Sequence, residues 1–205
     1  MAILVCCTFL VSIGYLEGKP EEISSQRYRQ SVCRFADRVL SDGRDKYGPE
    51  KTPLFVDGLH VETLEPARWK CRGETWVLSN FANQQPLLRT LDGLTALTGA
   101  AEYRQAAEEA TKCALTRLRT PNGLLYWGGH LAWDLEQEKP VGQYDDVHEL
   151  KSQQPYYQLM WRVDSQRTAE LTETIWAAHV LDWSLLDYNR HGSVTTRRTG
   201  VLWPR

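Results

Sequence analysis

The sequence predicts an all-α protein of about five or six helices, with long loops and one small β-hairpin. In several segments apolar residues recur at three- and four-residue steps, the spacing that places them on one face of a helix. Glycine or proline interrupts the pattern after these segments. Helix pairs joined by loops that contain glycine, histidine and aromatic residues are typical of an α/α toroid. Because no tandem repeat is evident, periodicity alone does not establish that arrangement.

The first helical pattern precedes a long irregular loop. The pattern ends at Asp42-Gly43, a typical helix stop. The loop runs from Gly43 to about Thr63, and a loop of this length in a compact domain is more often functional than idle. The apolar residues of the helix are Tyr28, Val32, Phe35, Val39 and Leu40.

Four further elements are expected after the loop. A leucine stripe from Leu87 to Leu97 predicts a second helix, and the stripe from Tyr103 to Leu118 predicts a third. A hairpin is expected from Asp134 to Gly142, and a short helix from Tyr156 to Arg162. The last helix begins at an N-cap, Asp164 or Ser165, because an oxygen at that position accepts a free backbone N–H group. One side of that helix consists of Leu171, Ile175, Ala178, His179 and Asp182.

Two histidines and a glutamate offer the donor atoms of a mixed nitrogen and oxygen metal site. These residues are His130, Glu149 and His191, and such a set suits Mn, Fe, Co, Ni or Zn rather than Ca or Mg. The separations are 19 residues from His130 to Glu149 and 42 from Glu149 to His191. The three side chains therefore have to converge from separate elements, unlike the closely spaced ligand pairs of a zinc finger.

Each of these residues also has a purely structural interpretation. Two glycines before His130 allow close backbone approach, but they also suit a tight turn with an exposed histidine. Glu149 fits a solvated helix end, and its neighbour His148 points the other way on a strand or loop. Arg190 and His191 fit the negative end of a helix dipole. His179, on an apolar helix face, is expected to be a hydrogen-bonded core residue.

Four segments together give the chain a family resemblance. They are Leu124-Leu-Tyr-Trp-Gly-Gly-His130, Val147-His-Glu-Leu-Lys151, Gln154-Pro-Tyr-Tyr157 and Asn189-Arg-His-Gly192. From about Asp45 to Gly192 the chain resembles the polysaccharide lyase family 2 pectate lyases and a related group of pectate-lyase-like barrel proteins. The resemblance implies an α/α toroid, here an incomplete helical barrel.

The resemblance also implies roles for particular residues. Two histidines and a glutamate hold a transition metal in that family, which assigns His130, Glu149 and His191 as ligands. An arginine beside one histidine ligand acts as the base, which assigns Arg190. The expected metal is Mn, Co or Ni, with Zn or Fe as alternatives.

The implied reaction is a β-elimination on a uronic-acid polysaccharide such as pectate. The hydrogen on C5 is weakly acidic because the adjacent carboxylate resists further negative charge, and a divalent cation on that carboxylate removes the obstacle. Arginine normally stays protonated, although a nearby cation favours its neutral form. Lys151 and Tyr157 are alternative proton carriers or substrate contacts. Trp127 is a further candidate contact, because tryptophan and tyrosine stack on sugar rings, although core packing is the more common role of such residues.

Two other functions stay open. A glycoside hydrolase needs two carboxyl groups, which Asp57, Asp145, Asp146 and Glu149 offer; a sugar epimerase on a similar barrel is the related alternative. The chain ends thirteen residues after Gly192, whereas members of the resembled family continue through further helices. We therefore also consider an inactive, truncated remnant.

Composition limits the partners and the compartment. The net charge of −2, with 24 basic and 26 acidic residues, argues against nucleic acid as a partner. No apolar run has the roughly 18 residues expected of a membrane span. Residues 1–20 form either a signal or leader segment or a wrongly assigned start, and residues 21–205 form the lyase-like domain. The protein is expected to be exported or periplasmic if the leader is a signal, and cytoplasmic otherwise.

Overall fold

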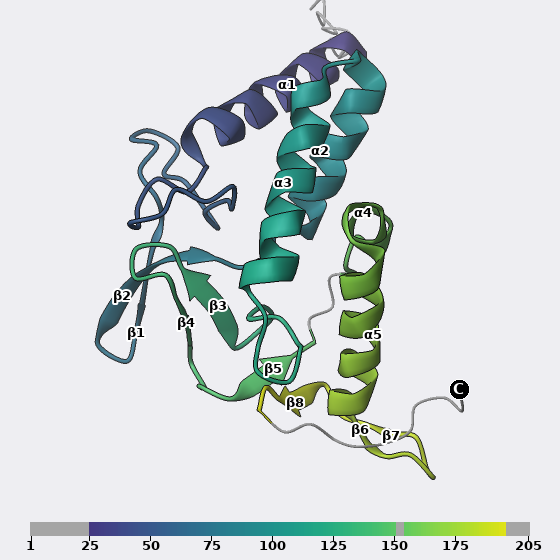
Figure 1. Cartoon of the computed structure of the whole chain (residues 1–205). Coiled ribbons are helices and arrows are strands. Elements are labelled where there is room, and N and C mark those ends of the chain that lie inside the picture. Colours follow the sequence, from purple (N-terminus) through teal and green to yellow (C-terminus); the bar gives the residue numbers. More distant parts are fainter. Residues whose placement is uncertain (1–24, 151–153, 196–205) are drawn as a thin grey trace, which may run out of the picture.

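The computed structural model describes residues 25–150 and 154–195, so the expected leader lies outside the described part. Its elements have a mixed α/β composition, with helices on one side and short sheets on the other (Figure 1). They follow in the order α1 (Ser25–Asp42), β1 (Arg68–Cys71), β2 (Glu74–Ser79), α2 (Gln85–Thr98), α3 (Ala101–Arg117), β3 (Leu131–Asp134), β4 (Lys139–Gly142), β5 (Val147–Glu149), α4 (Tyr157–Val163), α5 (Ser165–His179), β6 (Val180–Asp182), β7 (Asp187–Tyr188) and β8 (His191–Ser193).

The prediction of an all-α toroid is therefore wrong. Within the described residues there are five helices and eight strands, and the strands form three sheets. The expected hairpin is confirmed as β3 and β4, but it belongs to a four-stranded antiparallel sheet in the order β1-β2-β3-β4. The other two sheets pair β5 with β8 and β6 with β7. These strands are two to six residues long, too short for an alternating pattern to distinguish them from loops.

The helix predictions are largely confirmed. Helices α2 and α3 lie side by side, α4 packs against α3, and α5 packs against α4 (Figure 1). Gly99 ends α2 in the left-handed conformation, at φ 80°, and the Asp164 side chain caps α5 by accepting a hydrogen bond from the backbone N–H of Arg167. The last helix stops at His179 rather than at Asp182, because residues 180–182 form β6.

Leucine and alanine side chains from the helices form the main core, together with residues of the loops and of β2 and β3. The apolar stripe of α1 is the exception, because Ala36 is the buried residue of that helix while Tyr28 and Phe35 are exposed. Among the fully buried side chains are Leu88, Leu91, Leu115, Leu118, Leu159 and Met160.

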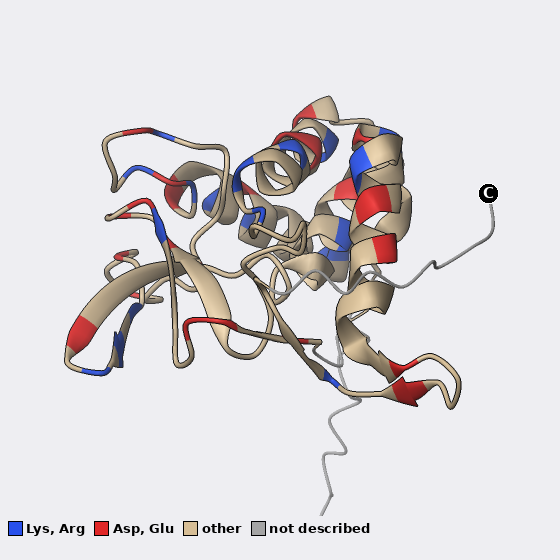
Figure 2. Cartoon of the chain, turned by 60° about the horizontal axis from the view of Figure 1, so that its bottom comes forward, with Lys and Arg blue, Asp and Glu red and all other residues tan. Residues whose placement is uncertain are grey.

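Charged residues join the helices to one another. Figure 2 shows acidic and basic residues mixed along the helices. Asp92 of α2 pairs with Arg104 of α3 at 2.6 Å and with Arg162 of α4 at 3.0 Å. Burial opposes the charged form of Asp92, yet hydrogen bonds from Tyr156, Arg104 and Arg162 hold the pKa of this carboxyl below its usual value.

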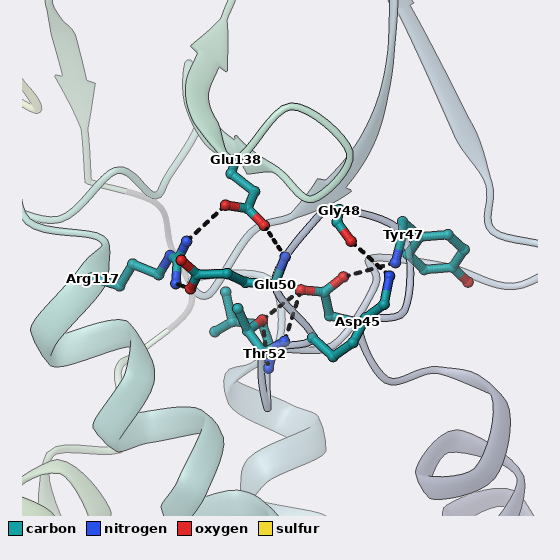
Figure 3. A network of polar contacts seen from close by, with 9 residues as sticks. Asp45, Tyr47, Gly48, Glu50, Thr52, Arg117 and Glu138 are labelled. Carbon is teal, nitrogen blue, oxygen red and sulfur yellow. Dashed lines mark hydrogen bonds and ion pairs between the residues drawn. The ribbon is translucent and has the colours of Figure 1, made fainter.

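The long loop after α1 is held by side chains that accept backbone hydrogen bonds (Figure 3). The Asp45 carboxylate accepts from the backbone N–H of Tyr47 and from both the N–H and the hydroxyl of Thr52. Glu138, in the β3–β4 turn, accepts from the backbone N–H of Glu50 and pairs with Arg117. Hydrogen bonds therefore explain the conformation of this part of the loop, for which the sequence analysis favoured a functional role.

None of the described helices is long and apolar enough to cross a membrane.

Candidate metal centre

The pairing of β5 with β8 places Glu149 directly opposite His191. A parallel bridge between Gly128 and Glu149 brings the loop that contains His130 to the other side of the same carboxylate. One donor atom from each of His130, Glu149 and His191 lies within 4.8 Å of the other two. The structure thus brings together the three residues that the sequence analysis singled out, from segments far apart in the chain.

The donor atoms face one another at short distances. The Nε2 atoms of His130 and His191 are 3.3 Å apart, and the two rings stack at 5.3 Å between their centroids. His130 Nε2 lies 3.7 Å from Glu149 Oε2, and His191 Nε2 lies 3.7 Å from Glu149 Oε1. All three residues are partly buried.

The two glycines before His130 are required by this geometry. Gly128 has a φ of +113°, a conformation that side chains strongly disfavour, and a Cβ there would overlap the backbone oxygen of Glu149. A Cβ on Gly129 would overlap the carboxylate of Glu149 itself. The glycines therefore leave the space in which the Glu149 side chain lies.

The residues fit a first-row divalent ion. Two ligands bonded at about 2.1 Å lie about 3.0 to 3.4 Å apart at octahedral to tetrahedral angles. The observed separation of 3.3 Å between the two nitrogens falls in this range, and the nitrogen–oxygen separations of 3.7 Å are slightly longer. The Nδ1 atom of His130 is buried without a hydrogen-bond partner among the described residues. The ring is instead packed edge-on against Tyr144, at 4.9 Å between centroids.

Arg190 lies at the rim of this cluster. Its Nη1 is 3.4 Å from Glu149 Oε1, and 66% of its side chain is exposed. Its backbone carbonyl accepts a hydrogen bond from Leu150 N, which continues the pairing of β5 with β8. The predicted base is therefore next to the candidate ligands, and most of its side chain is accessible to solvent.

The three predicted substrate contacts differ in their surroundings. Lys151 lies outside the described residues. Tyr157, at the start of α4, is exposed and lines a pocket of about 230 Å³ together with Glu149 and Tyr188. Trp127 also lines that pocket but is only 3% exposed, and its ring stacks on Phe81. A role for Trp127 as a substrate contact stays a prediction.

The three aspartates that the hydrolase interpretation adds to Glu149 have different surroundings from one another. Asp57 accepts hydrogen bonds from Asn80 N, Asn83 Nδ2 and Gln84 Nε2. Asp145 pairs with Arg72 on the surface. Asp146 lines a further pocket with His191.

A second pocket near the cluster has no counterpart in the sequence analysis. It measures about 210 Å³ and lies over the four-stranded sheet, with Trp69, Lys70, Asn80 and His130 in its wall. Gly128 lines both this pocket and the one that contains Tyr157. The sequence signal for this hairpin is the two-residue turn Arg72-Gly73, which has positive φ at both positions, since glycine favours such a turn.

Two further histidines lie behind the cluster. On β5, His148 is fully buried whereas Glu149 is partly exposed, which confirms that neighbouring side chains point to opposite sides of the strand. His179 is also fully buried and hydrogen-bonded, as expected of a core histidine. The sequence analysis did not predict that the two rings are bonded to each other.

Comparison with known proteins identifies both a family model and a curated relative that match this chain. Residues 52–205 match the family model described as periplasmic pectate lyase. Over 176 residues the chain is 38% identical to a pectate disaccharide-lyase of Dickeya dadantii (strain 3937), a match that covers 84% of this chain and 32% of that protein. The chain thus spans about a third of the length of this curated relative.

Proposed function

Since this chain belongs to the periplasmic pectate lyase family, we propose that it binds a divalent transition metal and acts on a uronic-acid polysaccharide by β-elimination. The observation that most strongly supports the proposal is the convergence of His130, Glu149 and His191 from three separate segments. Structural roles for the three residues taken singly do not explain why their donor atoms face one another.

The ligands would be His130 Nε2, His191 Nε2 and the Glu149 carboxylate. Two imidazole nitrogens and a carboxylate suit a first-row transition metal better than Ca or Mg. The family resemblance implies Mn, Co or Ni, with Zn or Fe as alternatives. When bound, the ion neutralises the uronate carboxylate next to C5. The chain's own contribution is to hold the three donors in place and to leave one side of the cluster open.

Arg190 is the proposed base. In its neutral form it removes the proton from C5, and the electron pair of that bond forms the double bond between C4 and C5. The bond from C4 to the glycosidic oxygen breaks, and the oxygen leaves with its electron pair and takes a proton from solvent. The exposed guanidinium, 3.4 Å from Glu149, is close enough to the ligands to reach a sugar held there.

The two pockets give the polymer room on both sides of the metal ligands. Trp69 and Lys70 lie in one pocket, and Tyr157 and Tyr188 lie in the other. Aromatic rings stack on sugar faces, and a lysine pairs with a uronate carboxylate. We propose that adjacent sugar units occupy the two pockets, with Gly128 between them.

The family description also supports a location outside the cytoplasm. We propose that the protein is exported and that residues 1–20 act as its signal. N-terminal sequencing of the protein secreted by an expressing cell tests this, because an intact Met1 on exported protein contradicts it.

The proposal is tested with the purified 205-residue chain, freed of metal and then loaded with Mn²⁺, Co²⁺ or Ni²⁺. We expect about one bound ion per chain and an unsaturated uronide, detected by its ultraviolet absorbance, when polygalacturonate is added. His130→Ala should abolish both, whereas Arg190→Lys should keep the metal and lose the product. His60→Ala is the control, because His60 is exposed and outside the cluster.

Three results contradict the proposal in different ways. Absence of bound metal contradicts the metal centre. Cleavage without unsaturated product favours the hydrolase alternative, since hydrolysis leaves no double bond. Bound metal without any cleavage contradicts the lyase reaction for this chain while keeping the metal centre.

A further inference from the structure

A chain of three hydrogen bonds runs behind the proposed metal ligands. The indole Nε1 of Trp127 donates to His148 Nε2 at 2.7 Å. His148 Nδ1 lies 2.8 Å from His179 Nε2, and His179 Nδ1 lies 2.8 Å from the carbonyl oxygen of Asn189. None of the four residues joined by these hydrogen bonds belongs to the proposed ligand set.

The donors and acceptors of this chain have only one consistent arrangement. An indole N–H group can only donate, so His148 Nε2 must accept and carry no proton. A neutral His148 then has its proton on Nδ1, which donates to His179 Nε2. His179 therefore has its own proton on Nδ1, where the carbonyl of Asn189 accepts it. Every ring nitrogen of His148 and His179 has a hydrogen-bond partner when both rings are neutral.

Burial supports this neutral state. Both histidines are fully buried, and Trp127 is nearly so. Burial and the neighbouring His179 lower the pKa of His148 to about 3. Burial also lowers the pKa of His179, although its hydrogen bond to Asn189 opposes this shift.

The series of hydrogen bonds from Trp127 to Asn189 includes a residue from each segment that supplies a proposed ligand. Trp127 lies three residues before His130, and His148 directly precedes Glu149. Asn189 precedes Arg190, and its side-chain oxygen accepts a hydrogen bond from the backbone N–H of His191. The three segments are therefore joined to one another through the two buried rings.

Two contacts tie the segment of His191 closely to His179. The backbone N–H of Asn189 donates to the carbonyl of His179 at 2.8 Å, so the two residues are bonded in both directions. Gly192 packs on the His179 ring, because a Cβ there would meet Cε1 and Nε2 of the ring at 3.1 Å. The ring of His179 thus packs directly against the backbone of β8 at Gly192.

We propose that His148 and His179 are positioning residues, which hold the three ligand-bearing segments at the spacing that a metal ion requires. The inference rests on the proposed metal centre and goes beyond it, because it assigns a function to two histidines that bind neither metal nor substrate. Groups hydrogen-bonded to metal ligands are typically worth 10- to 100-fold in metal affinity. The two rings act through residues next to the ligands, and we expect effects within this range.

The first test measures the tautomers in the metal-free protein by nitrogen NMR of the histidine rings at neutral pH. We expect both His148 and His179 to carry a single proton on Nδ1. A proton on Nε2 of either ring, or a charged ring, contradicts the directed chain, whether or not the protein binds metal.

The second test measures Co²⁺ affinity and the visible spectrum of the bound ion. Trp127→Phe removes one donor and leaves an aromatic ring against Phe81, so we expect affinity to fall about tenfold. Trp133→Phe is the matched control, because Trp133 is buried in β3 and outside the hydrogen-bond chain. It should leave the affinity and the spectrum unchanged.

Substitutions of His179 separate positioning from mere packing. His179→Leu removes both hydrogen bonds, and we expect the affinity to fall about 100-fold. In His179→Asn the amide nitrogen takes the place of Nδ1 and donates to Asn189 but the bond to His148 is still lost, so only part of the lost affinity should return. Thermal unfolding of the metal-free variants checks that each is folded, and Trp127→Phe decides the question if His179→Leu is not.

The outcomes distinguish this inference from the proposed function. If the unaltered chain binds no Co²⁺, the metal centre fails and the positioning role fails with it. If the unaltered chain binds Co²⁺ and Trp127→Phe binds it as well as Trp133→Phe does, the positioning role is wrong while the metal centre stands.

Discussion

The helical region and the region around the proposed metal centre are held together by different interactions. Helices α2 to α5 pack through leucine and alanine side chains, with ion pairs across their edges. Around the centre, glycines without room for a side chain, short strand pairs and buried histidines fix the structure instead. Substitutions in the two regions should therefore affect different quantities: stability in the first and metal affinity in the second.

Leu91→Ala is expected to have the largest effect on stability. Leu91 is fully buried in α2, and its loss leaves a cavity that costs about 2–5 kcal/mol in the free energy of unfolding. Chemical denaturation measures this cost. Co²⁺ affinity of the folded variant should be unchanged; a large fall in affinity would show that the two regions are coupled.

Gly129→Ala is expected to lower Co²⁺ affinity much more than it lowers stability. The new Cβ overlaps the Glu149 carboxylate, so this ligand has to move. We expect Co²⁺ affinity to fall about 100-fold, or about 2.7 kcal/mol. Titration with Co²⁺ measures it, and affinity equal to that of the unaltered chain would mean that Glu149 is not a ligand.

Asp92→Asn tests the ion pairs of the helical region. We expect a loss of about 1–3 kcal/mol at neutral pH, since hydrogen bonds from Arg104, Arg162 and Tyr156 lose a charged acceptor. Because the pKa of Asp92 is lowered in the folded state, its contribution is present above the unfolded value of about 3.9 and is lost as pH falls through the folded value. Denaturation curves of the two proteins should therefore converge in acid, and a gap that persists there contradicts this account.

Gly93→Ala should have the smallest effect and serves as the control for Gly129→Ala. Gly93 lies in α2 with open space where a Cβ would be, so alanine should stabilise the protein by about 0.5–1 kcal/mol. Metal affinity should not change. Destabilisation measured by denaturation would contradict the open environment of this position.

The same difference between the regions explains what the sequence could predict. Helices α2, α3 and α5 were predictable because each repeats its apolar residues over several turns within one segment. The cap at Asp164 and the stop at Gly99 are local signals of the same kind. The short strands have no such repeat, and β5 finds its partner β8 more than forty residues later, so the all-α prediction missed them.

The candidate site was predictable only in part. His130, Glu149 and His191 were identified by a family resemblance and not by spacing, since no local pattern links positions so far apart. The bond between His148 and His179 depends on where α5 ends relative to β5, which is a property of the fold. Burial of Trp127 follows from its packing on Phe81, and the sequence could not distinguish this from an exposed sugar contact.

The most direct test of the central claim is X-ray absorption spectroscopy of the Co²⁺-loaded chain. We expect two imidazole nitrogens at about 2.1 Å and oxygen in the remaining positions, with the multiple-scattering signal of histidine. In His191→Ala one imidazole should disappear from that signal. A spectrum without histidine scattering, or one that His191→Ala leaves unchanged, would contradict the proposed metal centre.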